Sequence, residues 1–356
     1  MNRYRVGIVG ATGLVGQRLV ERLDRHPWFE LRALAASDRS AGKPYDEAAN
    51  WQLPGGGPPA AFAQLRVRRC RVDELDDCDL VLSALDAEIA RELEPAIAGA
   101  GIPVVSNSSA FRQHAEVPLV VPEVNPSHLE LIDGPRRRDG GYIVTNPNCS
   151  TTGLVVALAP LHRAFGVSQV VVTTMQAASG AGLAGPTALQ LLDNVLPHIP
   201  GEEQKMEREV GKILGRVEAA RIEPAPLVVS AHCHRVPTID GHLEAVSVKL
   251  AVGADLDAVR GALLDFRGAI EPGSLPSAKA RPLLVRDEDD RPQPRLDRDE
   301  GSGMTVVVGR LRRCPVLDLR FVVLSHNTVR GAAGGTLLNA ELLAARELLP
   351  RRGGAA

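Results

Sequence analysis

The sequence has few aromatic residues and no strong excess of either charge. Phe, Trp and Tyr make up only 3% of its 356 residues, too few for a surface on which nucleic-acid bases stack. The formal net charge of −2 gives no basic patch to attract a phosphate backbone. No apolar run reaches the ~18 residues of a membrane helix, and the start of the chain lacks a secretory signal pattern. We therefore expect a cytoplasmic protein that binds neither nucleic acid nor a membrane.

Cysteines are scarce as well. The chain has five, an odd number, without the paired C-x-x-C spacing of a zinc site or a disulfide framework. His232 and His234 flank Cys233 and would share one face of a strand, but the sequence offers no third cluster of ligands beside them. We therefore expect no bound metal.

The first part of the chain alternates strand-like and helix-like segments. A β-branched run at residues 4–9 is followed by glycines and then by leucines at helical spacing. Further strands are predicted at residues 29–37, 79–85 and 102–108, with a helix at residues 87–101. This alternation predicts an α/β domain with a doubly wound parallel sheet of the Rossmann type.

The second part of the chain has a different sequence pattern, in which strand-like runs predominate. Strand-like runs at residues 167–180, 227–238, 242–252 and 304–325 predict an α+β domain with a mostly antiparallel sheet. Residues 286–303 are charged and contain prolines, and this composition predicts an exposed loop.

The length of the chain favours two domains, because single cores stop growing at roughly 250–300 residues. Residues 327–349 carry leucines at helical spacing after a glycine-rich entry, which predicts a helix that returns to the first domain. We therefore divide the chain into residues 1–149 plus 330–356, a dinucleotide-binding domain, and residues 150–329, a catalytic and dimerisation domain.

Three glycines follow the first strand. Gly10, Gly13 and Gly16 open the next helix, where free N–H groups would face a pyrophosphate, although the spacing G-x-x-G-x-x-G departs from the usual G-x-G-x-x-G. A packing turn without a ligand is the alternative. After the second strand, Ser37 and Arg39 suit the 2′-phosphate of NADP, whereas the intervening Asp38 suits the ribose hydroxyl of NAD. We favour NADP.

Cys149 stands between a Pro-Asn turn and an apolar helix. At the helix N-terminus, the macrodipole would depress the thiol pKa, and the free amides could stabilise an oxyanion. Ser150, Thr151 and Thr152 could cap the helix. The polar turn suits a nucleophile better than a buried structural cysteine. Beside a nicotinamide, such a thiolate suggests exchange between an aldehyde and an activated acid through a thioester.

Segments along nearly the whole chain resemble, in order, those of aspartate-semialdehyde dehydrogenase. They are GATGLVGQ, SNSSAFR, NPNCSTTG, TMQAASGAG, GEEQKM, CHRVPTIDGH and NTVRGAAGGTLLNAELL. The segment RPQPRLDRDEGSGMTVVVGR resembles the branch of this family found in archaea and fungi. On this resemblance, residues 286–303 are ordered, against the expectation from composition.

The resemblance implies a role for each residue of the site. Cys149 is the nucleophile, His242 the general acid/base, and Gln176 orients the acyl group. Arg235 binds the substrate carboxylate, and Glu202 or Glu203 its ammonium; we favour Glu202, which shares a helix face with Lys205. Arg112 and Lys205 bind phosphate, with Asn148 close by. The implied cofactor contacts are Gly10, Thr12, Gly13, Val15, Ser37, Arg39, Ser40 and Asn339.

The implied reaction is the NADPH-dependent reduction of L-aspartyl 4-phosphate to L-aspartate 4-semialdehyde and phosphate. It would serve lysine (through diaminopimelate), methionine and threonine synthesis, in a homodimer or homotetramer. An acyl-CoA reductase of the malonyl-CoA type and N-acetylglutamyl-phosphate reductase are alternatives, although the latter usually has NPGCY where this chain has NPNCS. A non-catalytic dinucleotide-binding regulator is another. It would need none of Cys149, Gln176, Arg235 and His242.

Overall fold

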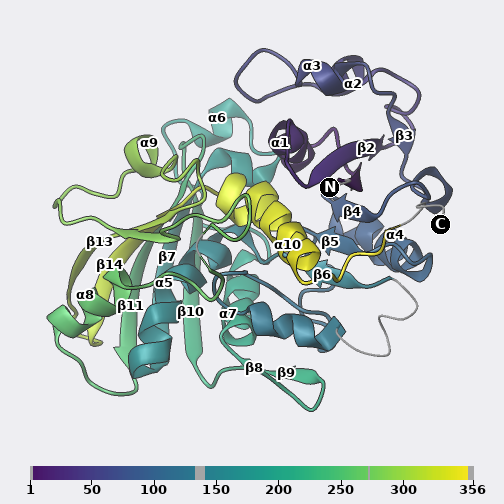
Figure 1. The fold of residues 1–356 in the computed structure, drawn as a ribbon. Helices are drawn as coiled ribbons and strands as arrows, with labels where there is room; N and C mark the ends of the chain where they lie inside the picture. Colours follow the sequence, from purple (N-terminus) through teal and green to yellow (C-terminus); the bar gives the residue numbers. More distant parts are fainter. Residues whose placement is uncertain (1–2, 133–140, 272, 352–356) are drawn as a thin grey trace.

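The computed structural model describes residues 3–132, 141–271 and 273–351, and they form two large sheets (Figure 1). The first sheet has the order β3-β2-β1-β4-β5-β6, with every neighbouring pair parallel. This is the strand order of a Rossmann sheet, as predicted. Its strands are β1 (Tyr4–Val9), β2 (Phe29–Ala36), β3 (Arg68–Arg69), β4 (Leu80–Ser83), β5 (Val104–Ser106) and β6 (Ile143–Thr145).

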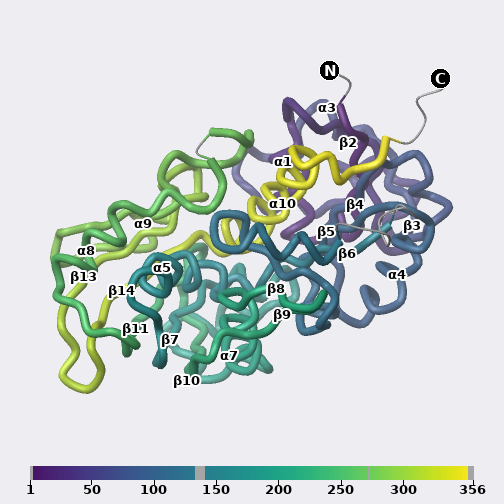
Figure 2. Tube along the Cα trace, turned by 60° about the horizontal axis from the view of Figure 1, so that its bottom comes forward, coloured from purple at the N-terminus to yellow at the C-terminus, as the bar shows by residue number. Residues whose placement is uncertain are grey.

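Helices cover both faces of the first sheet. On one face, α1 (Leu14–Leu23) and α10 (Gly334–Ala345) pack against alternate residues of β1 such as Val6 and Ile8. On the other face, α4 (Ala87–Gly99) contributes Ile97 to a separate cluster. The predicted return of the C-terminal helix is confirmed, and a π-helix, η5 (Val329–Ala333), leads into it (Figures 1 and 2). Shorter helices are α2 (Tyr45–Ala48), α3 (Ala60–Ala63), η1 (Val72–Glu74) and η2 (Pro126–Ile132).

The second sheet has the order β10-β7-β11-β14-β13-β12. Its three inner pairings are antiparallel and its two outer pairings are parallel, so the predicted mostly antiparallel sheet is confirmed. Its strands are β7 (Val167–Gln176), β10 (Val228–Arg235), β11 (His242–Leu250), β12 (Leu283–Val285), β13 (Val306–Arg313) and β14 (Leu319–Ser325).

One buried helix covers this second sheet. Along α5 (Cys149–Phe165), every residue from Ser150 to Leu161 is buried, which is typical of a helix inside a core. The other helices are η4 (Ala178–Ala181), α6 (Ala188–Leu191), α7 (Glu202–Ile213), α8 (Leu256–Leu264) and α9 (Pro294–Asp297). A small hairpin is formed by β8 (Arg216–Glu218) and β9 (Arg221–Glu223).

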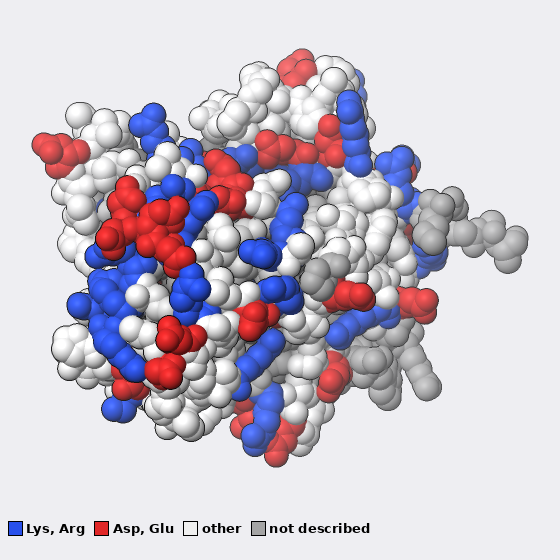
Figure 3. All heavy atoms as spheres, turned by 60° about the vertical axis from the view of Figure 1, so that its left-hand side comes forward, with Lys and Arg blue, Asp and Glu red and all other residues white. Residues whose placement is uncertain are grey.

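Residues 286–303 are folded onto the molecule, so the expectation from composition is wrong and the one from resemblance holds. Asp297 of α9 is fully buried and forms ion pairs with Arg291 and Arg286. These ion pairs within the segment neutralise the buried carboxylate, which allows the segment to pack. The face that carries α8, β13 and β14 shows acidic and basic side chains next to each other (Figure 3). Within the described ranges, every helix is too short or too polar to cross a membrane.

Candidate active site

One edge of the second sheet brings the predicted catalytic residues together. The parallel pairing of β10 with β7 places Arg235 beside Gln176, where both strands end. The antiparallel neighbour β11 begins with His242 at the same edge. The N-terminus of α5 brings Cys149 to this edge, so the structure gathers four residues from four elements.

Cys149 and His242 are in direct contact. The distance from Cys149 Sγ to His242 Nε2 is 3.2 Å, and His242 Nδ1 accepts a hydrogen bond from the backbone N–H of Ala177 at 3.0 Å. Burial, reinforced by the Arg235 guanidinium, holds the pKa of His242 well below its usual range. The ring is therefore neutral at pH 7. Because Nδ1 is an acceptor, Nε2 carries the proton and points it at the sulfur.

The expected depression of the cysteine pKa is wrong for this structure. Burial raises the pKa of the Cys149 thiol to about 12, and the Glu202 carboxylate adds to the rise. Arg235, Arg112 and the Ser150 N–H lower the pKa, but by less. Desolvation of the thiolate thus outweighs the helix N-terminus.

The cap of α5 also differs from expectation. The side-chain oxygen of Asn148 accepts from the amides of Ser150 at 3.0 Å and Thr151 at 3.2 Å. The predicted capping hydroxyls do not perform this role; that of Thr152 donates back to Asn148 O at 3.0 Å. Since Asn148 already occupies these amides, the expectation that they stabilise an oxyanion is not supported.

Arg235 and Gln176 lie at the same edge of the second sheet, and both are held by hydrogen bonds. Arg235 is buried, and its Nη1 donates to Ala177 O at 2.8 Å. Gln176 is buried too, and its Nε2 donates to Thr174 Oγ1 at 3.3 Å. Gly180 packs closely on Arg235 and His242, since an added Cβ would lie 2.6 Å from Arg235 Nη1 and 3.0 Å from His242 Cε1. A larger residue at position 180 would have to displace the Arg235 guanidinium.

Helix α7 brings the predicted substrate carboxylate to the cap of α5. Glu202 is buried and accepts from Asn148 Nδ2, and its other oxygen accepts from Lys205 Nζ at 3.2 Å. Glu203 instead accepts from the backbone N–H of Cys233 on β10 at 3.1 Å. Of the two alternatives, Glu202 is the one that faces the candidate site.

Arg112 meets a residue that sequence reasoning missed. Its Nη1 donates to Glu209 Oε1 at 3.1 Å, and the second oxygen of Glu209 accepts from the backbone N–H of Asn148 at 2.7 Å. Glu209 is 1% exposed. The sequence contains a signal for it, because Glu202, Lys205 and Glu209 follow the i, i+3, i+7 spacing of one helix face.

Gly331 is a second residue missed from the sequence. A Cβ on Gly331 of η5 would lie 2.7 Å from Cys149 Cβ, so this backbone packs directly on the nucleophile. The preceding Arg330 is fully buried and forms a bidentate pair with Glu123 at 2.6 and 2.8 Å. A single turn of π-helix is often found at functional sites.

The glycine turn fits a dinucleotide. Gly10 has φ +78°, and an added Cβ would lie 2.6 Å from Ala84 O; at Gly16 it would lie 2.3 Å from Gly10 O. Gly13 is the N-cap of α1 and supplies no capping side chain, which leaves the first amides of the helix for a ligand. Thr12 and Val15 are half-buried beside it.

The adenosine end and the nicotinamide end of the predicted cofactor site lie on different elements. Ser37 and Arg39 are exposed just after β2, and Ser40 N donates to Ser37 O at 2.9 Å in a turn. Asp38 Oδ1 lies 3.7 Å from Arg69 Nε. On α10, Asn339 donates to Val120 O at 3.0 Å, and its buried Oδ1 has no hydrogen-bond partner within the described part of the chain.

Among the described residues no group of three His, Cys, Asp or Glu side chains could hold a metal ion.

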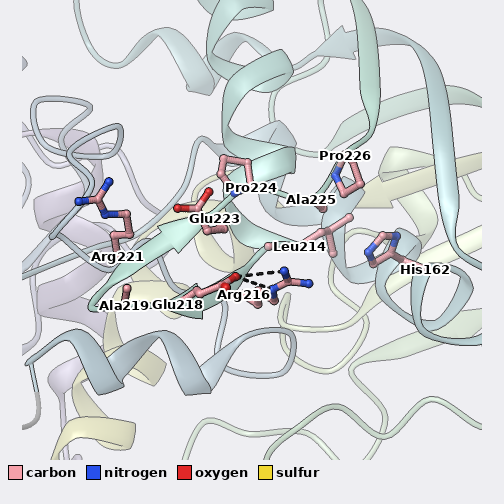
Figure 4. Close-up of a pocket in the computed structure, with 11 residues that line it drawn as sticks. His162, Leu214, Arg216, Glu218, Ala219, Arg221, Glu223, Pro224, Ala225 and Pro226 are labelled. Atoms are coloured by element: carbon pink, nitrogen blue, oxygen red, sulfur yellow. Dashed lines mark hydrogen bonds and ion pairs between the residues drawn. The ribbon is translucent and has the colours of Figure 1, made fainter.

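A pocket lies apart from this site. It has a volume of about 790 Å³ and lies beside the β8–β9 hairpin, where Arg216 and Glu218 form an ion pair at 3.0 Å (Figure 4). The described residues that line it include none of the predicted site residues, so it does not belong to the site.

Two family descriptions match the chain. Residues 5–132 match "Semialdehyde dehydrogenase, NAD binding domain", and residues 158–330 match "Semialdehyde dehydrogenase, dimerisation domain". The chain belongs to the semialdehyde dehydrogenase family. The residues that match the dimerisation domain are those that carry the second sheet.

Curated relatives within this semialdehyde dehydrogenase family are similar over nearly their full length. The aspartate-semialdehyde dehydrogenase of Methanothermobacter thermautotrophicus is 51% identical over 342 residues, 95% of this chain and 98% of the relative. That of Saccharomyces cerevisiae is 42% identical, over 96% of this chain and 98% of the relative. A crystal structure of the Candida albicans enzyme with NADP has 41% identity and a TM-score of 0.91, over 98% of this chain and 100% of that one.

Proposed function

We propose that this chain reduces L-aspartyl 4-phosphate with NADPH to L-aspartate 4-semialdehyde and phosphate, through a thioester on Cys149. The observation that carries the proposal is the 3.2 Å approach of Cys149 Sγ to His242 Nε2, at a sheet edge shared with Gln176 and Arg235. Curated relatives at 42–51% identity are named aspartate-semialdehyde dehydrogenases, which supports the same substrate here. The product would enter lysine, methionine and threonine synthesis.

The substrate would be held at both ends. Arg235 offers its planar guanidinium to the carboxylate, and Glu202 offers a buried carboxylate to the ammonium. Arg112 and Lys205 would bind the phosphate, with Asn148 between them and the nucleophile. Gln176 would orient the acyl group by hydrogen bonds.

Substrate binding would also activate the thiol. Glu202 raises the pKa of Cys149, and an ammonium paired with Glu202 would offset this effect. The thiol loses its proton to solvent as the substrate binds. The thiolate then attacks the acyl carbon, the C–O bond to phosphate breaks, and phosphate leaves as the thioester forms. An ammonium paired with Glu202 would therefore weaken one of the two causes of the raised Cys149 pKa, the other being burial.

His242 would act on the oxygen of the acyl group. The fixed tautomer directs Nε2–H toward the reacting sulfur, where the hemithioacetal oxygen would form. Donation of a hydrogen bond to this oxygen stabilises its negative charge. Complete transfer of the proton would leave an imidazolate, because Nδ1 accepts from the Ala177 N–H and carries no proton of its own. The geometry thus supports hydrogen-bond donation by a neutral ring over general acid/base catalysis.

The cofactor residues support NADP, which when bound supplies or accepts the hydride at the acyl carbon. Gly10, Thr12, Gly13 and Val15 would surround the pyrophosphate at the start of α1. Ser37, Arg39 and Ser40 would bind the 2′-phosphate. The unpartnered Oδ1 of Asn339 would accept a hydrogen bond from a buried donor such as a carboxamide.

The domain division, assembly and location follow from the same reading. Residues 1–149 plus 330–356 would form the dinucleotide domain, supported by the packing of Leu337 and Leu338 in the core of the first sheet. Residues 1–2, 133–140 and 352–356 of this division lie outside the described part of the chain, as does residue 272 of the other domain. We propose a homodimer or homotetramer located in the cytoplasm.

One assay tests the reaction. NADPH formation is followed with aspartate semialdehyde, NADP and phosphate, then with CoA in place of phosphate, and then with N-acetylglutamate semialdehyde as the aldehyde. Phosphate-dependent turnover of aspartate semialdehyde alone is expected. Turnover that requires CoA would replace the proposal with an acyl-CoA reductase, and preference for the acetylated aldehyde with an N-acetylglutamyl-phosphate reductase. No turnover with any would favour a dinucleotide-binding regulator.

A further inference from the structure

Glu209 is a buried charged residue that joins two parts of the candidate site. Its Oε1 accepts from Arg112 Nη1 at 3.1 Å and its Oε2 from Asn148 N at 2.7 Å. These donors lie 97 and 61 residues away in the sequence. One carboxylate thus links the proposed phosphate-binding cation to the residue that precedes Cys149.

The same helix fixes the rest of the Arg112 segment. Lys212, one turn after Glu209, donates from Nζ to the carbonyls of Arg112 and His114 at 2.7 Å and of Val117 at 2.8 Å. Arg112 Nη2 also donates to Asn107 O at 2.6 Å. Both the backbone and the guanidinium of Arg112 are therefore placed by fixed contacts, most of them with α7.

The second contact of Glu209, with the backbone N–H of Asn148, fixes the start of α5. Asn148 caps the helix with its side chain, and its backbone N–H depends on Glu209 for an acceptor. A buried amide without an acceptor costs free energy, so this turn is tied to the carboxylate. An ionised carboxylate accepts at both oxygens, whereas a glutamine amide accepts at only one.

We propose that Glu209 is a positioning residue, which holds the phosphate-binding Arg112 and the turn before Cys149 in one fixed relation. The inference rests on the proposed function and extends it to a residue that does not itself touch substrate. Burying a carboxylate is costly, and burial raises the pKa of Glu209 even though Arg112 and the Asn148 N–H oppose the rise. The phosphate and the nucleophile must meet at one carbon atom, so a rigid link between their binding groups favours the reaction.

A purely electrostatic role gives the opposite prediction. If Glu209 only reduced the charge of Arg112, Glu209→Gln would strengthen phosphate binding and lower the KM for phosphate. If Glu209 positions both groups, its amide N–H₂ would face either Arg112 or Asn148 N–H, and one of the two contacts would be lost. The KM for phosphate would then rise and kcat would fall.

The test compares Glu209→Gln with Glu207→Gln in the phosphate-dependent oxidation of aspartate semialdehyde. Glu207 lies on the same helix and also accepts from a backbone N–H, that of Ala231 at 3.2 Å, but on the side of β10. We expect Glu209→Gln to lower kcat/KM for phosphate by about tenfold to a hundredfold, with the KM for the aldehyde and the affinity for NADP close to wild type. Glu207→Gln should leave all of these unchanged.

Glu209→Asp keeps two acceptor oxygens on a shorter side chain. It should therefore recover part of the kcat/KM for phosphate that Glu209→Gln loses. If Glu209→Gln does not fold, Glu209→Asp should still raise the KM for phosphate alone. The role of Glu209 would be overturned by a wild-type or lowered KM for phosphate in the variants. An equal rise in the KM values for phosphate and for the aldehyde would overturn it too. Wild-type protein without phosphate-dependent turnover would instead overturn the proposed function, and this inference with it.

Discussion

The sulfur of Cys149 lies 3.2 Å from Nε2 of His242, and the second ring nitrogen of His242 accepts from the Ala177 amide at 3.0 Å. This pair is a thiol beside a neutral imidazole, because burial raises the pKa of Cys149 to about 12 and lowers that of His242. A thiolate–imidazolium ion pair, formed by proton transfer to the ring, would require Nδ1–H to face another N–H.

The first prediction concerns the pH dependence of alkylation. A raised thiol pKa means that the thiolate fraction at pH 7 is small and grows with pH, so iodoacetamide should modify Cys149 faster throughout the alkaline range. Cys314 should react first at neutral pH, since backbone N–H groups of Leu317 and Val316 lower its pKa. Peptide mass spectrometry across pH ~6 to 10 measures both. A Cys149 rate that is already constant at neutral pH would show a preformed thiolate and contradict the assignment.

The second prediction concerns the π-helix. Gly331→Ala should destabilise the protein by about 1–3 kcal/mol and lower kcat, because the new Cβ would lie 2.7 Å from Cys149 Cβ. Gly261→Ala in α8 is the matched control, since a Cβ there meets nothing within 4 Å and should stabilise the helix slightly. Denaturant midpoints and turnover numbers give the comparison. Equal behaviour of the two variants would mean that the packing of η5 on Cys149 is unimportant.

The third prediction concerns cofactor choice. Arg39→Ala should weaken NADPH binding by about tenfold to a hundredfold and leave NADH binding nearly unchanged, because only NADPH carries a 2′-phosphate. Arg25→Ala is a control, since Arg25 is 92% exposed and precedes β2. Titration of cofactor fluorescence measures both constants. A similar loss for both cofactors in Arg39→Ala would remove Arg39 from the 2′-phosphate site.

The fourth prediction separates the two ends of the substrate. Arg112→Ala should raise the KM for phosphate by about tenfold to a hundredfold in the aldehyde-oxidising direction, with a smaller effect on the aldehyde. Arg235→Ala should do the reverse, because its proposed partner is the substrate carboxylate. Initial rates with each substrate varied in turn measure the split. If the two variants raise the same KM, the proposed orientation of the substrate is wrong.

The fold was largely predictable because its signals are local. The apolar run of β1 and the glycines after it specify a strand, a turn and a helix within a few residues. Residues 286–303 escaped prediction by composition, since the burial of Asp297 depends on its pairing with Arg291 and Arg286. Composition records the charges of a segment but not whether they neutralise one another.

The sequence predicted which catalytic candidates lie together at one edge of the second sheet, but not their electrostatics. The turn before Cys149 has a local signature, whereas the pKa of the thiol depends on burial by the whole fold. The spacing of α7 places Glu209 on the helix face of Glu202, but the sequence does not show its contact with Arg112, which is 97 residues away. The need for a glycine at position 331 comes from the packing of η5 against Cys149, which the sequence does not show.

The thioester on Cys149 is the central claim, and a reaction without phosphate tests it most directly. The protein is mixed with aspartate semialdehyde and excess NADP, NADPH is recorded by stopped flow, and the quenched protein is digested for mass spectrometry. We predict a burst of one NADPH per Cys149 and an aspartyl group on the Cys149 peptide, with steady turnover only after phosphate is added. Cys149→Ala should bind NADP normally and show neither burst nor adduct. A burst in Cys149→Ala, or an adduct on another residue, would contradict the account.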